Sequence, residues 1–117
     1  MKVYEVKEIL DATLLSGEDQ LDRMVAGAGG ADLMEAFLAA ATKDAVILTG
    51  LTTDDVIRTA KVAGVAAVVF VRGKQPDASA IDLAQSYNLP AMVTRYSLFV
   101  ASGKLYMNGL RGLDGSW

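Results

Sequence analysis

Three short apolar runs between residues 45 and 93 constrain the fold of the chain more than any other feature. They cover residues 45–48, 67–71 and 91–93, and a segment with the spacing of an amphipathic helix separates each run from the next. Strands and helices that alternate in this way are typical of βαβ units, whose right-handed crossovers place the strands side by side and parallel. The pattern predicts an α/β fold in three layers, with helices on both faces of a mostly parallel sheet.

The residues at the ends of the two intervening helices support this prediction. Thr53 is a favoured N-cap residue, and Gly64 is a favoured residue just past the end of a helix. Pro76 and Asp77 open the second helix, since proline is well tolerated in a first helical turn. Each helix is therefore expected to begin shortly after one strand and to end shortly before the next.

The N-terminal part of the chain carries shorter elements. Apolar residues at helical spacing predict a helix over residues 3–11. Short apolar runs predict strands over residues 13–15 and 24–26. We expect both strands to extend the sheet, which then need not be wholly parallel and can be mixed.

The glycine-rich segment 27–32 follows a predicted strand and precedes a predicted helix, which is the position of a dinucleotide-binding fingerprint. It lacks the G-x-G-x-x-G order, because Asp32 holds the place of the third glycine, and no Walker A lysine follows. A loop over residues 27–30, with Asp32 as the N-cap of a helix over residues 33–41, is the simpler interpretation.

The C-terminal part predicts one more helix and then a tail. The helix runs from residue 96 to 102 and is ended by Gly103, and residues from about 104 to 117 are expected to be irregular. No linker-like or low-complexity stretch divides the chain. We therefore expect residues 1–117 to form a single domain.

The absence of two residue types argues against an enzyme. The chain has no His and no Cys, which removes catalytic triads, imidazole acid–base chemistry, thiolate nucleophiles and the usual zinc ligands. Asp54 and Asp55 are adjacent carboxylates, but favourable charge at a helix N-terminus explains them without a metal ion. We expect no catalytic residue, no metal site and no cofactor.

Composition also narrows the compartment and the partners. A chain without Cys fits a reducing compartment, and the N-terminus lacks the apolar core of a signal peptide, so a cytoplasmic location is expected. No apolar stretch is long enough to span a membrane, and a net charge of −3 argues against nucleic acid. The hydrophobic fraction of 52% is high and suggests a surface covered in a homo-oligomer, most simply a dimer.

A ligand site, if present, is expected where the parallel strands end. In open α/β sheets, ligands bind beyond the carboxyl ends of the strands. The segments at those ends are rich in Gly, Thr, Arg and Lys, which suits a small anionic ligand. The candidate ligand-binding residues are Gly27, Asp32, Thr49, Gly50, Thr52, Thr53, Arg72, Gly73, Lys74, Thr94 and Arg95.

Two plainer interpretations of these segments stay open. Gly and Thr after a strand are ordinary turn and cap residues, and basic residues at a strand end are often simply solvated. The same loops could also form a surface for a partner protein. The hypothesis of one site requires the segments 49–53, 72–74 and 94–97 to lie on the same side of the molecule.

Several segments also follow one another in a recognisable order over about residues 3–110. They are Val25-Ala26-Gly27-Ala28, Asp32-Leu33-Met34, Ile47-Leu48-Thr49-Gly50-Leu51, Val56-Ile57-Arg58-Thr59-Ala60, Val69-Phe70-Val71-Arg72-Gly73-Lys74-Gln75-Pro76 and the stretch 90–106, which contains Thr94-Arg95-Tyr96 and Ser102-Gly103-Lys104-Leu105-Tyr106. Their order and spacing resemble the stand-alone form of the DRTGG-domain family. The literal string Asp-Arg-Thr-Gly-Gly is absent, so the motif that names the family is not carried over.

The resemblance implies an α/β fold like the N-terminal domain of HPr kinase/phosphorylase. It also implies a regulatory or dimer-forming role, because such domains occur within phosphotransacetylases and between nucleotide-sensing CBS domains of some pyrophosphatases. It transfers no catalytic residues. The first hypothesis is thus a non-catalytic regulatory or assembly module that forms a homodimer or docks on a partner enzyme. The alternative is a sensor of a small anionic metabolite or nucleotide.

Overall fold

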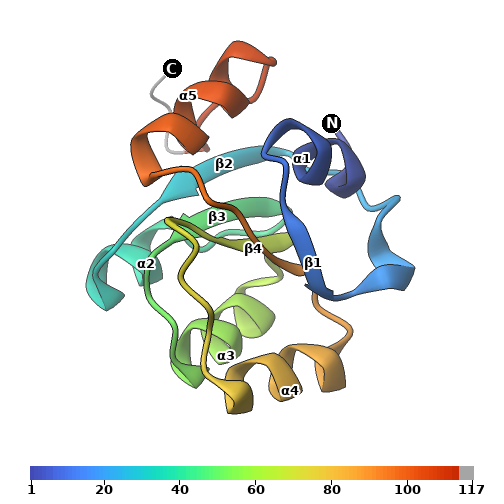
Figure 1. Cartoon of the computed structure of the whole chain (residues 1–117), viewed down its shortest axis with the longest axis vertical. Coiled ribbons are helices and arrows are strands. Elements are labelled where there is room, and N and C mark those ends of the chain that lie inside the picture. The colour runs from blue at the N-terminus through green and yellow to red at the C-terminus, as the bar shows by residue number, and fades with distance from the viewer. Residues whose placement is uncertain (114–117) are drawn as a thin grey trace.

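The computed structural model describes residues 1–113 and contains one five-stranded sheet (Figure 1). The strands lie in the order β1-β5-β4-β3-β2. Strands β2 to β5 are parallel, and β1 pairs antiparallel with β5 at one edge. The expected mixed, mostly parallel sheet is confirmed. The strands are β1 (Thr13–Ser16), β2 (Gly27–Gly30), β3 (Ala45–Thr49), β4 (Ala67–Phe70) and β5 (Ala91–Val93).

Helices cover both faces of this sheet, as the three-layer prediction requires. Figure 1 places α1 and α5 on one side of the sheet and α3 and α4 on the other. A short 3-10 helix, Glu18–Gln20, follows β1. The helices are α1 (Val3–Ile9), α2 (Met34–Ala40), α3 (Asp54–Ala63), α4 (Ala78–Tyr87) and α5 (Leu98–Met107).

The two central strands divide the core into two clusters. Every residue of β3 and β4 is buried, and successive side chains of a strand point to opposite faces. Val46 and Val69 pack with residues of α1 and α5, whereas Ile47 and Phe70 pack with residues of α2, α3 and α4. This two-sided burial explains why both strands are unbroken apolar runs rather than alternating ones.

The predicted loop over residues 27–30 is wrong, because these residues are strand β2. Gly27 to Gly30 pair in parallel register with Ala45 to Leu48, while residues 24–26 form no strand and Met24 makes only an isolated bridge to Lys2. Three glycines lower the intrinsic strand preference of this segment. Pairing with the buried strand β3 overrides that preference.

Asp32 does not cap α2, contrary to the prediction. The N-cap residue is Leu33, and no side chain accepts a hydrogen bond there. The helix is held instead by Phe37, which is fully buried, and the Asp32 carboxylate turns to another partner described below.

The C-terminal helix is longer than predicted. Helix α5 continues through Gly103 to Met107, so residues 104–107 are helical rather than irregular. A single glycine costs a helix interior only about 1 kcal/mol, which the buried Ala101 and Leu105 on either side offset. Residues 108–113 belong to no helix or strand, and residues 114–117 of the predicted tail lie outside the described part of the chain. Within residues 1–113, no helix has the length and apolar character needed to cross a bilayer.

Candidate ligand site at the carboxyl end of the sheet

The segments that follow the parallel strands meet at one side of the molecule. The Val71 N–H donates to the Thr49 carbonyl at 2.9 Å, and the Gly73 N–H donates to the Thr94 carbonyl at 2.8 Å. The Asp77 N–H reaches back to the Thr52 carbonyl at 3.0 Å. These bonds join the ends of β3, β4 and β5, so segments 49–53, 72–74 and 94–97 lie together, as the hypothesis of one site requires. We call this region the carboxyl end of the sheet.

Asp32, Gly50 and Arg72 form the best-defined contact in this region. The Gly50 N–H donates to Asp32 Oδ1 at 2.7 Å, and Arg72 Nη1 donates to Asp32 Oδ2 at 3.1 Å. The carboxylate thus joins the exits of three strands. It also neutralises Arg72, which reduces the attraction of that guanidinium for an anion.

The backbone at Arg72 and Gly73 is unusual. Both residues are in the left-handed region, with φ of 60° and 66°, and a non-glycine residue rarely adopts that conformation. The turn points the Arg72 N–H at the Tyr96 carbonyl, 2.8 Å away, and the Gly73 N–H at Thr94. These two donors are therefore used within the protein.

The threonine hydroxyls at the strand ends serve the fold. Thr94 Oγ1 is buried and donates to the Leu10 carbonyl at 2.7 Å, which ties β5 to the end of α1. Thr49 is also buried, and its Oγ1 accepts the Leu51 N–H at 3.1 Å. Both side chains shape the loops and do not face outward, which is the plainer of the two sequence interpretations.

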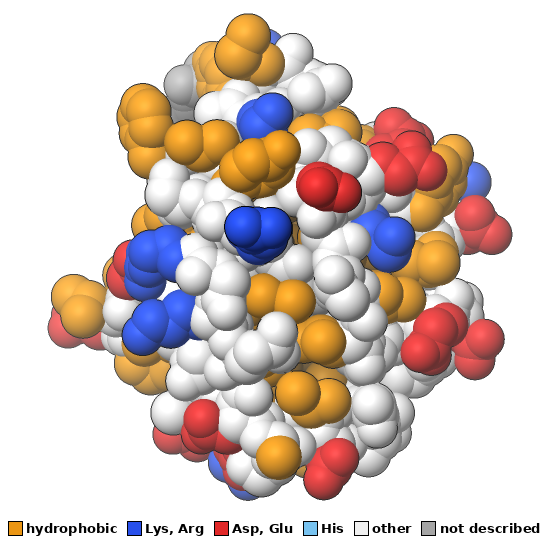
Figure 2. All heavy atoms as spheres, in the orientation of Figure 1, with side chains coloured by type: hydrophobic (Ala, Val, Ile, Leu, Met, Phe, Trp, Pro, Cys, Tyr) orange, Lys and Arg blue, Asp and Glu red, His pale blue; other side chains and the backbone are white. Residues whose placement is uncertain are grey.

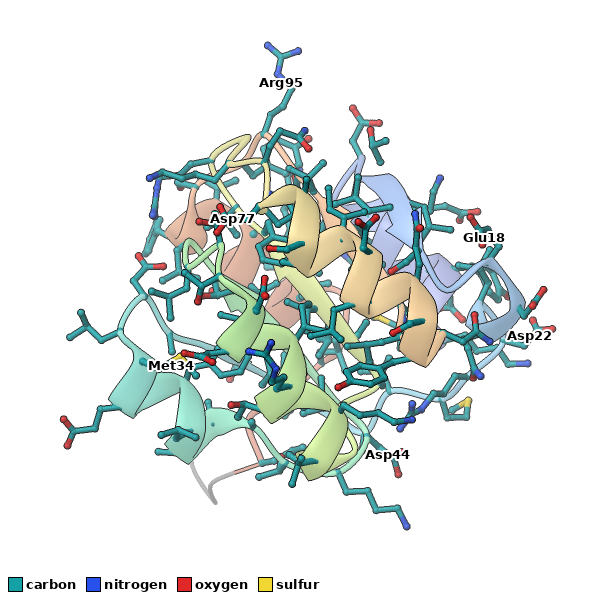
Figure 3. The ribbon with its side chains drawn as sticks, turned by 90° about the horizontal axis from the view of Figure 1, so that it is seen from below. Glu18, Asp22, Met34, Asp44, Asp77 and Arg95 are labelled. Atoms are coloured by element: carbon teal, nitrogen blue, oxygen red, sulfur yellow. The ribbon has the colours of Figure 1, made fainter. Side chains whose placement is uncertain are left out.

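Lys74 and Arg95 are the basic side chains left for a ligand. Both are exposed, and within residues 1–113 neither takes part in an ion pair. Figure 3 shows Arg95 projecting away from the body of the molecule. In Figure 2, Lys and Arg side chains gather at the left and centre of the face, below α5. The carboxyl end of the sheet is therefore basic at its surface.

The start of α3 is less favourable to an anion than predicted. Thr53 is the N-cap residue, as expected, but its side chain makes no capping hydrogen bond. Asp54 and Asp55 occupy the first turn, where Arg58 pairs with both, and the Ser79 hydroxyl donates to Asp54 at 2.6 Å. The two carboxylates already use the favourable potential of the helix N-terminus. Among the described residues, no three acidic side chains lie close enough together to hold a metal ion.

Gly27 lies apart from the other candidate residues. It pairs with Ala45, the first residue of β3, and is therefore at the opposite end of the strands. A β-carbon there would meet the Arg111 carbonyl oxygen at 2.6 Å, so the absence of a side chain serves close packing. Of the predicted set, the structure brings together the residues from Asp32 onward and leaves Gly27 outside.

Comparison with known proteins decides the family. The family model described as the DRTGG domain matches residues 5–106, most of the chain. The chain belongs to the DRTGG-domain family. No curated protein matches this DRTGG domain.

A solved structure shares its fold. It is the crystal structure of the CBS and DRTGG domains of the regulatory region of Clostridium perfringens pyrophosphatase, complexed with the activator diadenosine tetraphosphate. The TM-score is 0.69 at 14% identity, over 89% of this chain. The match spans 45% of that chain, so this DRTGG domain corresponds to less than half of the pyrophosphatase fragment. At this identity the likeness establishes the fold alone.

A cavity among the described residues lies away from the carboxyl end of the sheet. It measures about 620 Å³ and lies between α2 and the edge strand β2. Small residues line most of it, so the cavity offers few polar side chains to a ligand. The lining residues are Ala28, Gly29, Ala36, Ala39, Ala40, Thr42, Ala45, Gly112 and Leu113. The many Ala and Gly residues of β2 and α2 were the sign in the sequence that side chains would not fill this space.

Several large apolar side chains remain on the surface, and the pattern of the sequence does not predict which ones. Leu33, Val62, Phe99 and Met107 are 72%, 89%, 87% and 88% exposed. Phe99 and Met107 both lie on α5. Apolar residues occur all round this helix, so they cannot all be buried against the sheet, and this was the sign in the sequence that some would be exposed. These side chains give this DRTGG domain an apolar outer surface.

Proposed function

We propose that this DRTGG domain is a cytoplasmic, non-catalytic regulatory module that works as a homodimer. The observation that carries the proposal is the exposure of Phe99 and Met107 on one helix, together with Val62 and Leu33 elsewhere. Exposed apolar side chains that cluster on one element are typical of surfaces that another chain covers. The similar pyrophosphatase fragment is named as a regulatory region, which supports a role of the same kind here.

The side-chain chemistry of the chain supports the non-catalytic part of this proposal. His and Cys are missing from the sequence. Two acidic groups at the carboxyl end of the sheet are engaged, because Asp32 pairs with Arg72 and Asp54 with Arg58. A module of this kind would act by docking on itself or on a partner enzyme.

Sedimentation velocity of the purified chain over a hundredfold range of concentration tests the homodimer. A species of twice 12.3 kDa, with a monomer appearing only on dilution, is the expected result. A single 12.3 kDa species up to the millimolar range would overturn the proposal.

A second candidate function is the binding of a small anionic metabolite at the carboxyl end of the sheet. The specific observation in its favour is that Lys74 and Arg95 are exposed there without an ion-pair partner among residues 1–113. The activator in the similar pyrophosphatase structure is a polyphosphate, diadenosine tetraphosphate, which is the same chemical class of ligand.

Differential scanning fluorimetry with ATP, AMP, acetyl phosphate and diadenosine tetraphosphate tests this candidate. A ligand at 100 times its Kd stabilises a protein by about 2.7 kcal/mol, which is readily seen as a rise in Tm. The Lys74→Ala and Arg95→Ala variants should each lose the shift, and Asp32→Asn should enlarge it by removing a negative charge. Lys43→Ala is the matched control, because Lys43 lies against Gly64 at the other end of the strands. No shift with any of the four compounds would overturn the candidate.

A further inference from the structure

The outward face of helix α5 carries exposed apolar side chains near both of its ends. Phe99 and Met107 are almost fully exposed, and Val100 and Tyr106 are 40% and 45% exposed. Ala101 and Leu105 form the opposite, buried face against the sheet. Figure 1 places α5 at the outer end of the molecule, and Figure 2 shows hydrophobic side chains gathered over it. Among residues 1–113, this side of α5 is left largely exposed, with only Arg111 lying over the Tyr106 ring.

Gly103 lies in the middle of this outward face. Residues three and four apart on a helix are neighbours, so Gly103 is flanked by Phe99 and Val100 on one side and by Tyr106 and Met107 on the other. A β-carbon at Gly103 would meet no atom within 4 Å, and its φ is not positive. The fold of the single chain therefore has no steric need for glycine here, although glycine costs the helix about 1 kcal/mol relative to alanine. A glycine at such a place allows a second backbone to approach closely.

The face has the same chemistry in both directions from Gly103. Four positions before it is Phe99 and four after it is Met107, while three before it is Val100 and three after it is Tyr106. Consider a two-fold symmetric pair of antiparallel helices that cross at Gly103. Each residue then faces the partner residue that lies equally far from Gly103 in the opposite direction along the helix. Phe99 would then face Met107 of the partner subunit, and Val100 would face Tyr106 of the partner subunit. Both pairs are apolar, and a thioether against an aromatic ring is favourable.

The charges near α5 also suit a second copy of the same chain. The helix contains no acidic residue, and its one cation, Lys104, lies over the Tyr96 ring at 4.8 Å. Arg111 lies over the Tyr106 ring at 4.0 Å and donates to the Tyr106 carbonyl. In the antiparallel pair, Lys104 would face Ser102 of the partner subunit, so the two lysines do not oppose each other at the crossing point.

We propose that the homodimer forms through helix α5, with the two-fold axis passing beside Gly103. This inference rests on the proposed function, since it names the surface by which the homodimer would assemble. Val62, which is 89% exposed, lies on α3 at the opposite face of the sheet and takes no part.

The absence of Cys from the chain allows a direct test by crosslinking. On a two-fold axis between helices in contact, the two copies of position 103 bring their Cα atoms within about the 4.4–6.8 Å that a disulfide spans. Mild oxidation of a Gly103→Cys variant should therefore give a covalent dimer in most of the protein. Val62→Cys is the matched control, equally exposed but on α3, and should give little. Equal or greater crosslinking through Val62→Cys would overturn the assignment.

Charge substitutions separate the failure of this inference from the failure of the homodimer itself. Phe99→Glu and Met107→Glu should each raise the dimer dissociation constant at least about tenfold, whereas Val62→Glu should leave it unchanged. If the wild-type chain is dimeric and neither α5 variant weakens it, the α5 surface is wrong and the homodimer stands. If the wild-type chain is monomeric, both fall.

Discussion

The guanidinium of Arg72 lies against the α-carbon of Gly50, in the space that a β-carbon at residue 50 would occupy. Asp32 completes the contact by accepting hydrogen bonds from the Gly50 N–H and from Arg72. Residues from the ends of β2, β3 and β4 are joined in this way. The contact fixes the geometry of the carboxyl end of the sheet, where the anionic ligand is proposed to bind.

The first prediction concerns this contact. Gly50→Ala should lower the free energy of unfolding by about 1 kcal/mol or less, because the new methyl group pushes the Arg72 guanidinium off Asp32 and an exposed ion pair is worth no more than that. In an Arg72→Ala background the same substitution should cost less, since only Asp32 Oδ1, 3.0 Å from the new β-carbon, remains close to it. Urea unfolding of the four proteins measures the coupling, and strictly additive costs would contradict the account.

A second prediction concerns Gly17, at the turn after β1. Its φ is +83°, and a β-carbon would lie 2.5 Å from the Pro90 backbone, which cannot move aside as a flexible side chain can. Gly17→Ala should therefore cost more than about 3 kcal/mol, since steric overlap adds to the conformational penalty. Gly73 has φ +66° with no atom within 4 Å of a β-carbon, so Gly73→Ala isolates the conformational penalty of about 1–2 kcal/mol. Thermal unfolding of both variants checks the difference, and equal costs would refute the role of Pro90.

The third prediction concerns the buried hydroxyl of Thr94. Thr94→Val keeps the shape of the side chain but removes the donor to the Leu10 carbonyl. The cost should be about 1–3 kcal/mol, the usual penalty for a buried polar group that loses its partner. Thr94→Ser retains the hydroxyl and should cost less than Thr94→Val. The reverse order in urea unfolding would mean that the methyl group, and not the hydrogen bond, holds β5 to α1.

The sequence predicted the central part of the fold well. The strands β3, β4 and β5 are short, unbroken apolar runs buried on both faces. The residue at each end of α3 is a strong local signal: Thr53 is its N-cap residue, and Gly64 adopts the expected left-handed conformation. Such signals depend on a few neighbouring residues. The meeting of segments 49–53, 72–74 and 94–97 then follows from parallel strands alone.

The errors arose where long-range contacts override local preference. The glycines of β2 form a strand because β3 lies beside them, and Asp32 bonds to Gly50 and Arg72 rather than capping α2. Helix α5 passes through Gly103 because Leu105 is buried beyond it. Leu105 is close in sequence to Gly103, but β3, Gly50 and Arg72 are distant in sequence from the residues that they contact. The exposure of Phe99 and Met107 likewise depends on how α5 packs, which periodicity within the helix did not reveal.

Small-angle X-ray scattering of the wild-type chain tests the central claim, a homodimeric regulatory module, most directly. The Cα radius of gyration of the single folded chain is 12.2 Å, and its mass is 12.3 kDa. At about 0.1 mM, where a homodimer of micromolar affinity is almost fully formed, the scattering mass should be twice that of one chain and the radius of gyration clearly larger. A scattering mass of 12.3 kDa at every concentration would contradict the account.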